Sequence, residues 1–372
     1  MRVLQVLSST NINSGIANVV MNYYRNIDRN DVQFDCLVFS HAPNNFNSEI
    51  NELGGTIYYF TQPSLTNYLK SKKELKAFFQ EHGKEYDIIH CHEILVAKMV
   101  FKYARKYGDV KCISHSHSVK LSEKFLRSVR NRFIILGLKK KSDYCFACSK
   151  NAGKTAFGKN IINDKKFLVL PNAIKLEKYI YNLSDRNIAR EELGLQNKFV
   201  LGNVGRLSYE KNQKFAMDVL RSILSKSPNK DVALLIVGGG SYERELKEYA
   251  IERQIEDKVV FAGMRKDIPQ LLSAMDYFVF PSRFEGFGIT LLEAQANGVD
   301  CLCFDNMPEE IKATDRLSSL PVESSCDEWA DIILATKERH NRESYVEVLK
   351  NKGFDIIGQA ANLKDIYSKI VK

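Results

Sequence analysis

The sequence of 372 residues has no long hydrophobic run. Its longest apolar stretches, such as Phe133–Leu136 and Val232–Val237, have the length of a strand or a short helix, whereas a membrane-spanning helix needs about 20 apolar residues. The apolar stretch Val3–Leu7 is too short for the core of a secretory signal peptide, and no cleavage pattern follows it. We therefore expect a cytoplasmic protein without a spanning helix.

The sequence also lacks a secretory signal that would carry its eight cysteines to an oxidising compartment. Reduced thiols are therefore expected rather than disulfides. Cys145 and Cys148 form a C-x-x-C pattern, but they fall on the expected strand Asp143–Ala147 and its end, where residues three apart point to opposite faces. We expect no redox or metal role for this pair, and we expect Cys301 and Cys303 to be core residues of another strand.

A third absence concerns dinucleotide binding. Two-domain NAD-dependent oxidoreductases carry G-x-G-x-x-G after the first strand, whereas residues 8–15 here read SSTNINSG, and Gly238–Gly240 is followed by Tyr242 and Glu243 rather than by a third glycine. No nucleic-acid-binding module is visible either. The net charge of +9 fits an anionic ligand, an anionic membrane face or nucleic acid, and it is equally compatible with ordinary solvated surface charge.

Short β-rich runs alternate with helical patterns along the whole chain, which predicts doubly wound, mostly parallel α/β sheets. The expected strands are Val3–Leu7, Phe34–Phe39, Thr56–Phe60, Asp87–His90, Lys111–Ser114, Asp143–Ala147, Phe167–Leu170, Phe199–Val204, Val232–Val237, Val259–Phe261, Tyr277–Phe280 and Asp300–Cys303. A polar stretch between Pro171 and Asn197 separates two such halves.

We predict two Rossmann-like domains that face one another across a cleft, with ligands beyond the carboxyl ends of the strands. The domains are placed at residues 1–175 and 176–353, and residues 354–372 are expected to form a helix that packs back on the first domain.

The most informative segment is Glu285–Glu293, where a Gly-containing loop joins an expected strand to an expected helix that begins near Ile289. Helix starts offer unpaired N–H groups and partial positive charge, which suit a phosphate. Glu285 then lies near a sugar hydroxyl, and Glu293, one turn into the helix, can accept hydrogen bonds from a ribose diol. Taken alone, the two glutamates are equally compatible with a capping carboxylate and a surface helix residue.

A second segment, Gly205–Asn212, follows the expected strand Phe199–Val204. Its cations Arg206 and Lys211 can clamp a diphosphate leaving group, whose charge grows as the glycosidic bond breaks. In isolation, a loop arginine and lysine also fit solvated surface charges.

Together these segments resemble the donor half of retaining glycosyltransferases of the GT-B fold, which belong to the large fourth family of the sequence classification. The resemblance rests on an ordered set of residues, namely Gly205-Arg206-Leu207 with Lys211, Gly238–Gly240, Gly263-Met264-Arg265, Asp276, Pro281-Ser282, and Glu285 with Glu293. The stretches His115–His117 and Ala147–Lys150 are similar to bacterial exopolysaccharide and capsule glycosyltransferases.

The resemblance implies a role for each donor residue. Arg206 and Lys211 hold the diphosphate, Glu293 binds the ribose, and Glu285 holds the transferred sugar. The remaining implied donor contacts, made by backbone around the base, sugar and phosphate, are Gly205, Met264, Arg265, Phe287, Gly288, Ile289 and Thr290. The implied reaction retains anomeric configuration and uses neither metal nor cofactor, and UDP is the expected nucleotide.

The first half is implied to bind the acceptor, a glycan or a lipid-linked glycan. Ser14 and Gly15 stand where the family often has two adjacent glycines, so a close backbone approach at Ser14 is less well supported. His117 falls where the family places an active-site histidine at a strand end, and His115, expected in the same loop, competes for that role.

A metal site is a weaker alternative. His90 and His92 follow one strand, and His115 and His117 follow another, so two strand ends could offer zinc ligands. No carboxylate pattern supports such a site, and the family needs no metal.

A basic segment in the first half suggests contact with an anionic membrane surface. Its cations are Lys120, Lys124, Arg127, Arg130, Arg132 and Lys139–Lys141, and they interleave with Leu121, Phe125, Leu126, Val129, Phe133 and Ile134. The alternative is a solvated helix that covers the sheet.

Two further functions remain open at this stage. A nucleotide-sugar epimerase on the same fold would release nucleotide without an acceptor, and a non-enzymatic nucleotide-sugar binder would not turn over at all. Fold analogy alone does not separate these from a transferase.

Overall fold

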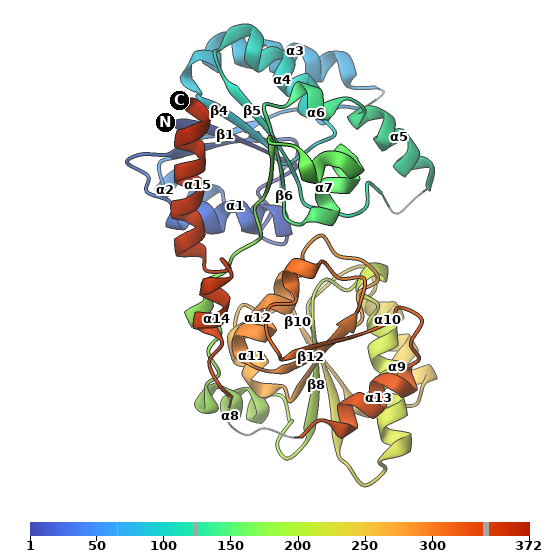
Figure 1. The fold of residues 1–372 in the computed structure, drawn as a ribbon. Helices are drawn as coiled ribbons and strands as arrows, with labels where there is room; N and C mark the ends of the chain where they lie inside the picture. Colours follow the sequence, from blue (N-terminus) through green and yellow to red (C-terminus); the bar gives the residue numbers. More distant parts are fainter. Residues whose placement is uncertain (65, 123–124, 338–341) are drawn as a thin grey trace. The chain divides into compact units, whose positions relative to one another are not determined.

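The computed structural model describes residues 1–64, 66–122, 125–337 and 342–372 (Figure 1). The chain divides into two compact units. The first unit contains Met1–Ile174 and Gly353–Lys372, and the second contains Lys175–Lys352. Each is an α/β unit built on a wholly parallel sheet, which confirms the predicted pair of Rossmann-like folds.

The first unit has seven strands in the order β3-β2-β1-β4-β5-β6-β7. They are β1 (Arg2–Leu7), β2 (Gln33–Val38), β3 (Ile57–Tyr59), β4 (Ile88–Cys91), β5 (Lys111–Ser116), β6 (Tyr144–Ala147) and β7 (Phe167–Val169). The helices are α1 (Gly15–Asn26), α2 (Asn47–Glu52), α3 (Tyr68–His82), α4 (Ala97–Tyr107), α5 (Phe125–Ile135), α6 (Leu138–Lys141), α7 (Lys150–Phe157) and α15 (Ile356–Val371).

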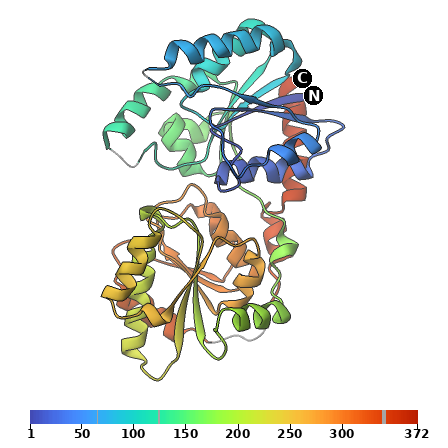
Figure 2. The same ribbon diagram turned by 180° about the vertical axis from the view of Figure 1, so that it is seen from behind.

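From β1 the sheet is extended in one direction by β2 and β3 and in the other direction by β4 to β7. Ligands are expected at the carboxyl ends of β1 and β4, where this change of direction occurs. Helices α3 and α4 pack on one face of the sheet, where Phe79 and Phe101 are fully buried. Helix α15 packs beside α1, and the two chain ends lie side by side (Figures 1 and 2). The final helix is therefore part of the first unit's core, with Tyr367 fully buried.

The second unit has six strands in the order β10-β9-β8-β11-β12-β13. They are β8 (Phe199–Val204), β9 (Val232–Val237), β10 (Val259–Gly263), β11 (Tyr277–Phe280), β12 (Asp300–Phe304) and β13 (Leu317–Leu320). The helices are α8 (Leu183–Glu192), α9 (Gln213–Lys226), α10 (Glu243–Glu252), α11 (Ile268–Ala274), α12 (Ile289–Asn297), α13 (Cys326–Ala335) and α14 (Val346–Asn351).

The second sheet is covered on both faces, and Figure 2 shows α9 and α10 together on one of them. On that side Trp329 of α13 packs edge-on against Phe215 and Phe304, with ring centroids 5.3 and 5.0 Å away. Such burial of large aromatic rings stabilises the layered arrangement of sheet and helices. The order of strands reverses between β8 and β11, which places the expected ligand site at their carboxyl ends.

The structure corrects the predicted strands at two points. Strand β5 continues to Ser116, so His115 lies inside the strand and not in the loop with His117. Strand β13 was not predicted, because its sequence Leu-Ser-Ser-Leu at the sheet edge carries little hydrophobic pattern. Among the described residues, no helix combines the length and apolarity needed to cross a bilayer.

Candidate active site

Three loops at the carboxyl edge of the second sheet are joined by backbone hydrogen bonds. Leu207 N donates to Gly239 O at 3.1 Å, and Gly238 N donates to Gly263 O at 2.8 Å. A Cβ atom at Gly238, whose φ is +137°, would stand 2.0 Å from the carbonyl oxygen of Gly205. The glycines therefore let the loops after β8, β9 and β10 approach closely enough to form one continuous backbone surface.

The side chains of Lys211 and Glu285 meet at the point where the strand order reverses. Lys211 follows β8, Glu285 follows β11, and the two form an ion pair with side chains 22% and 13% exposed. The Lys211 ammonium also lies 5.2 Å from the ring centroid of Phe280. The structure thus brings together two residues that the sequence assigned to the diphosphate and the transferred sugar.

Asn212 holds this arrangement in place. Its backbone is in the left-handed region with φ of 56°, and its side-chain amide donates to Pro281 O at 3.2 Å and accepts from Arg283 at 2.9 Å. The loop after β8 is therefore fixed to the loop after β11, and Lys211 is fixed beside Glu285.

Arg206 differs from Lys211 in its surroundings. Its side chain is exposed, and within the described part of the chain its guanidinium has no ion-pair or hydrogen-bond partner. Its carbonyl oxygen accepts a hydrogen bond from the side chain of Gln213 at 3.0 Å. A guanidinium of this kind is available to an anionic ligand without first giving up a protein partner.

The start of α12 presents the donor groups expected for phosphate. Gly288 precedes the helix with φ of 91° and offers no side-chain cap, so the N–H groups of Ile289 and Thr290 have no acceptor among the described residues. The Thr290 hydroxyl is buried there and has no hydrogen-bond partner in the part of the chain that the structure describes. The sequence indicated the backbone donors, but this hydroxyl was not predicted.

Glu293 is half-buried on the next turn of α12 and accepts a hydrogen bond from the Tyr179 hydroxyl at 2.7 Å. Burial raises the pKa of Glu293 to about 7, and the bond from Tyr179 opposes that rise. The carboxyl group therefore changes its charge near neutral pH. Tyr179 was not predicted as part of the site, since it lies 114 residues away in sequence.

The implied base-binding residues follow β10. Met264 is 62% exposed, and Gly239 packs directly beneath it, because a Cβ there would lie 2.9 Å from Met264 Cγ. The Arg265 side chain is held by Asp267 at 2.6 Å and Glu192 at 2.5 Å. Only the backbone of Arg265 is therefore well suited to a ligand, as the family resemblance implies.

The remaining predicted loop residues have unequal access to solvent. Phe287 is 2% exposed, with its side chain in the core, so the loop can offer a ligand only the backbone at this position. Gly205 is half-buried beside the aliphatic part of Lys211.

The predicted acceptor-side residues lie at the carboxyl edge of the first sheet. Ser14 caps α1 by accepting from Ala17 N at 3.4 Å. Gly15 is exposed, and a Cβ at that position would meet nothing within 4 Å. Steric room is therefore available on this loop for a ligand or a larger side chain.

The four neighbouring histidines differ in exposure. His117 is half-buried just after β5, whereas His90, His92 and His115 are buried. Burial lowers the pKa of His117 and of His90 to about 3, and it lowers the pKa of the other two well below the usual value. All four rings are consequently neutral at physiological pH. Ring nitrogens of His90, His92 and His115 lie within 4.8 Å of one another, so the zinc alternative retains a geometric basis.

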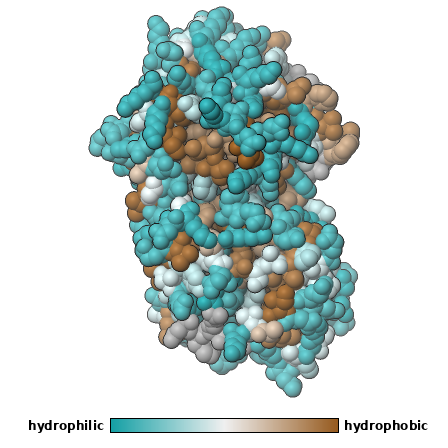
Figure 3. Space-filling view, in the orientation of Figure 1, coloured by the Kyte–Doolittle hydropathy of each residue, from teal (hydrophilic) through white to brown (hydrophobic). Residues whose placement is uncertain are grey.

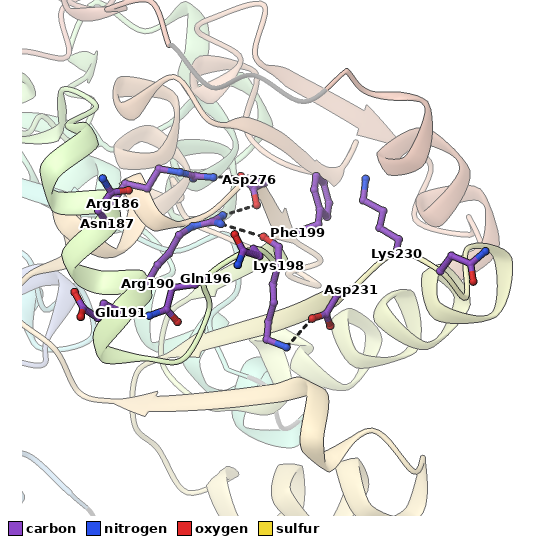
Figure 4. Close-up of a pocket in the computed structure, with 12 residues that line it drawn as sticks. Arg186, Asn187, Arg190, Glu191, Gln196, Lys198, Phe199, Lys230, Asp231 and Asp276 are labelled. Atoms are coloured by element: carbon purple, nitrogen blue, oxygen red, sulfur yellow. Dashed lines mark hydrogen bonds and ion pairs between the residues drawn. The ribbon is translucent and has the colours of Figure 1, made fainter.

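A large cavity of the second unit lies away from Lys211, Glu285 and the start of α12 (Figure 4). Its volume is about 750 Å³, and it opens at the amino ends of β8, β9 and β11. Arg186 and Arg190, which line it, both pair with Asp276 at 2.6 and 2.5 Å, and Asp276 also accepts from Val200 N at 2.7 Å. Asp276 therefore braces the sheet, and the cavity is at the opposite edge from Lys211 and Glu285.

Two family models match the chain, one in each unit. Residues 13–178 match the model described as Glycosyltransferase Family 4, and residues 185–333 match the model described as Glycosyl transferases group 1. The chain belongs to the family 4, group 1 glycosyltransferases. The prediction of a transferase is confirmed, and no finding supports the epimerase alternative.

Relatives that extend over nearly the whole chain agree with this assignment. EpsF of Bacillus subtilis is 28% identical over 374 residues, which cover 99% of this chain and 96% of EpsF. CapH of Staphylococcus aureus, named a capsular polysaccharide biosynthesis glycosyltransferase, is 25% identical and covers 91% of this chain and 90% of its own. The crystal structure of Anabaena HepE in complex with UDP-glucose has a TM-score of 0.72 at 22% identity, with 100% of this chain and 97% of that chain covered, which establishes the common fold.

Proposed function

We propose that this glycosyltransferase moves a sugar from a UDP-sugar to a lipid-linked glycan in polysaccharide biosynthesis, with retention of anomeric configuration and without a metal ion. The relatives support the substrate classes. HepE is solved with UDP-glucose, and an Escherichia coli relative, 25% identical over 332 residues, is named a UDP-Gal:alpha-D-GlcNAc-diphosphoundecaprenol galactosyltransferase.

The observation that carries the proposal is the group of donors around Lys211 and the start of α12. Among the described residues, the Arg206 guanidinium, the N–H groups of Ile289 and Thr290, and the buried Thr290 hydroxyl have no hydrogen-bond partner. Unsatisfied donors and partial positive charge at a helix start attract a phosphate group. The second unit therefore supplies the diphosphate site.

Lys211 exchanges partners when the donor binds. In the structure its ammonium pairs with Glu285, and a bound diphosphate offers a more highly charged partner within the same site. Transfer of Lys211 to the diphosphate leaves the Glu285 carboxylate free to accept hydrogen bonds from the sugar hydroxyls. One ion pair thereby becomes two separate substrate contacts.

These contacts act most strongly as the reaction proceeds. The bond between the anomeric carbon and the diphosphate oxygen breaks while a bond from the acceptor oxygen forms on the same face of the sugar. The acceptor proton passes to the departing phosphate oxygen, and UDP leaves. Because negative charge grows on the diphosphate, Arg206, Lys211 and the N–H groups of α12 stabilise the transition state more than the bound substrate.

A surface on the first unit suits a lipid-linked acceptor. On α5 and just beyond it, Phe125, Leu126, Phe133 and Leu136 are 79%, 80%, 70% and 70% exposed, and apolar side chains gather over α5 in Figure 3. Arg127 and Arg132 on the same helix are also exposed. Exposed apolar side chains beside cations bind the surface of an anionic bilayer. Lys124 lies outside the described residues.

The direct test supplies purified protein with a panel of UDP-sugars and an undecaprenyl-diphosphate-linked glycan. We expect release of UDP together with a new lipid-linked product, for at least one sugar. The anomeric configuration of the product, measured by NMR coupling constants, should match that of the donor. Nucleotide release without any acceptor product would contradict the transfer, and an inverted product would contradict retention.

The metal requirement is tested by chelation in the same assay. The cations and N–H groups named above neutralise the diphosphate, so EDTA should leave the rate within about twofold. Loss of turnover with EDTA, reversed by magnesium or manganese, would make a metal ion part of the donor site.

A further inference from the structure

A hydrogen-bonded network of buried side chains ends at His117. It contains Gln5 of β1, His90 and His92 at the end of β4, His115 and His117 at the end of β5, and Tyr367 of α15. Strands β1, β4 and β5 are neighbours in the sheet, so the network lies where the strand order of the first unit reverses. Its members come from widely separated parts of the sequence, and Gln5 stands at its centre.

One arm of the network runs from Gln5 to His117. The Gln5 Oε1 atom lies 2.8 Å from His92 Nε2, and His92 Nδ1 lies 2.7 Å from His117 Nε2. An amide oxygen can only accept, and a neutral imidazole has one N–H group and one lone pair. His92 therefore donates from Nε2 and accepts at Nδ1. It follows that His117 donates from Nε2 and keeps an unprotonated Nδ1.

The other arm runs from Gln5 through Tyr367 to His115. The Gln5 Nε2 atom donates to the Tyr367 hydroxyl at 3.4 Å, and that hydroxyl lies 2.5 Å from His90 Nδ1. If the hydroxyl uses its single O–H group on His90, then His90 donates from Nε2 to His115 Nδ1, and these two atoms lie 3.1 Å apart. In that arrangement His115 carries its proton on Nε2, a buried atom that has no hydrogen-bond partner among the described residues.

The two arms give adjacent rings opposite roles. His115 and His117 have ring centroids 4.0 Å apart, and in this arrangement His115 ends in an N–H donor whereas His117 ends in a lone pair on Nδ1. Among the described residues, His117 Nδ1 has no hydrogen-bond partner. A lone pair in this position can accept a hydrogen bond from a hydroxyl group, which is the group that a glycosyl acceptor or a sugar offers.

We propose that Gln5 is a positioning residue that fixes the tautomer of His117, so that His117 Nδ1 accepts a hydrogen bond from a substrate hydroxyl. Gln5 acts through His92 and does not touch the substrate. The role of the hydroxyl rests on the proposed function, whereas the tautomer is a property of the protein alone. The carbonyl orientation of one amide thereby sets the direction of the hydrogen bonds from Gln5 through His92 to His117.

The tautomer is measured by NMR on the full chain labelled with ¹⁵N-histidine, which has seven histidines. We expect the neutral form of His117 with its proton on Nε2, and of His92 with its proton on Nε2. A His117 proton on Nδ1 would show that the Gln5 amide is reversed and would overturn the proposal. One bound zinc per chain, with the histidine signals shifted by coordination, would overturn it as well, because the lone pairs would be used by the metal.

Two matched variants test the link to catalysis. Gln5→Met has similar size but replaces the amide oxygen by a weakly accepting thioether, so His117 should show mixed tautomers. We expect kcat to fall about tenfold while the KM for the UDP-sugar stays within about twofold. Tyr367→Phe removes only the long 3.4 Å contact of Gln5 Nε2 and leaves the Gln5 acceptor in place, so it should change the His117 signals less than Gln5→Met does. An unchanged His117 tautomer and unchanged kcat in Gln5→Met would contradict the role of Gln5. Should Gln5→Met fail to fold, the wild-type tautomer still decides the proposal, and absence of all transferase activity in the wild type would count against the proposed function instead.

Discussion

The carboxyl edges of the two sheets carry opposite kinds of polar chemistry. In the second unit, Lys211 and Glu285 form an ion pair between two loops, and the Arg206 guanidinium has no partner in the described part of the chain. In the first unit, four histidines are neutral, largely buried and hydrogen-bonded to fixed groups. The second edge therefore suits a ligand whose charge changes, and the first suits hydroxyl groups whose orientation must be fixed.

The comparison also explains how each edge is held. The charged edge, at the carboxyl ends of the second sheet, depends on glycine-containing loops and on Asn212. These fix the loop backbone and leave the side chains of the cations able to exchange partners. The neutral edge depends on side-chain hydrogen bonds that reach into the core, as far as Tyr367 on the last helix. Removing one group should thus have a local effect at the charged edge and a transmitted effect at the neutral edge.

The largest expected effect comes from the cations of the second unit. Lys211→Ala and Arg206→Ala should each lower kcat/KM on the order of 10- to 100-fold, because a charge-assisted hydrogen bond contributes roughly 1.5–3 kcal/mol. Arg206→Lys should recover only part of the loss, since a guanidinium can bind two oxygens at once. The double variant should lose less than the product of the two effects if both cations bind one diphosphate.

The control for these variants is Arg221→Ala, which removes an exposed cation from α9 of the same unit. The kcat/KM of this variant should remain near that of the wild type. If both Lys211→Ala and Arg206→Ala also remain within about twofold of wild type in kcat/KM, these cations are ordinary surface charges and the donor site lies elsewhere.

His117 tests the neutral edge. His117→Ala should lower kcat about tenfold or more while donor affinity changes little, since the ring is proposed to hold a hydroxyl rather than the diphosphate. His115→Ala is the comparison variant. A larger loss of kcat in His115→Ala would assign the binding of the hydroxyl to His115 instead of His117. Weakened UDP-sugar binding with intact kcat in His117→Ala would show that His117 contributes to donor binding, which is proposed for the second unit.

Glu293 gives a pH-dependent test of the charged edge. Its pKa is raised to about 7 by burial, and a carboxylate accepts two hydrogen bonds from a ribose diol better than a carboxylic acid does. UDP affinity should therefore be full above the pKa and fall as pH drops through it, by roughly tenfold per unit well below it. Calorimetric titration of UDP between pH 5.5 and 8.5 measures this.

Two substitutions separate Glu293 from other ionisable groups. Glu293→Gln should bind UDP more weakly at high pH and lose this pH dependence. Tyr179→Phe removes the hydrogen bond that lowers the Glu293 pKa, so the midpoint of the curve of UDP affinity against pH should move to higher pH. A wild-type profile that is retained in Glu293→Gln would assign the titration to another group, such as the UDP phosphate.

The predictable parts of the site are those encoded within short segments. Gly238–Gly240, Lys211 and the Glu285–Glu293 segment each follow one strand, and parallel strands bring their carboxyl ends to one edge whatever the remaining sequence. Contacts between distant side chains were not predictable: Tyr179 with Glu293 spans 114 residues, and Tyr367 with His90 spans 277. Nothing in the local pattern of a tyrosine on a helix states which buried atom its hydroxyl reaches.

The smallest effect on turnover is expected at α5, where the first unit carries exposed charges away from its neutral histidines. Replacing Arg127 and Arg132 by Glu should weaken binding to vesicles that contain anionic lipid, more strongly at low salt, because each surface cation contributes about 1 kcal/mol of attraction. The change should leave the rate with a water-soluble glycan acceptor unaltered. Lys139 is less suitable for this test because it pairs with Asp164 at 2.6 Å.

The apolar and electrostatic parts of this docking surface are separable. Replacing Phe125 and Leu126 by Ser removes side chains that are 79% and 80% exposed, and it should weaken vesicle binding at high salt as well, since hydrophobic insertion is not screened. Lys72→Glu with Lys73→Glu on α3 makes the same charge change on another exposed helix of the first unit and should have a smaller effect. If all three double variants bind vesicles as well as the wild type does, α5 is a solvated helix. The lipid-linked acceptor must then reach the first unit by another surface.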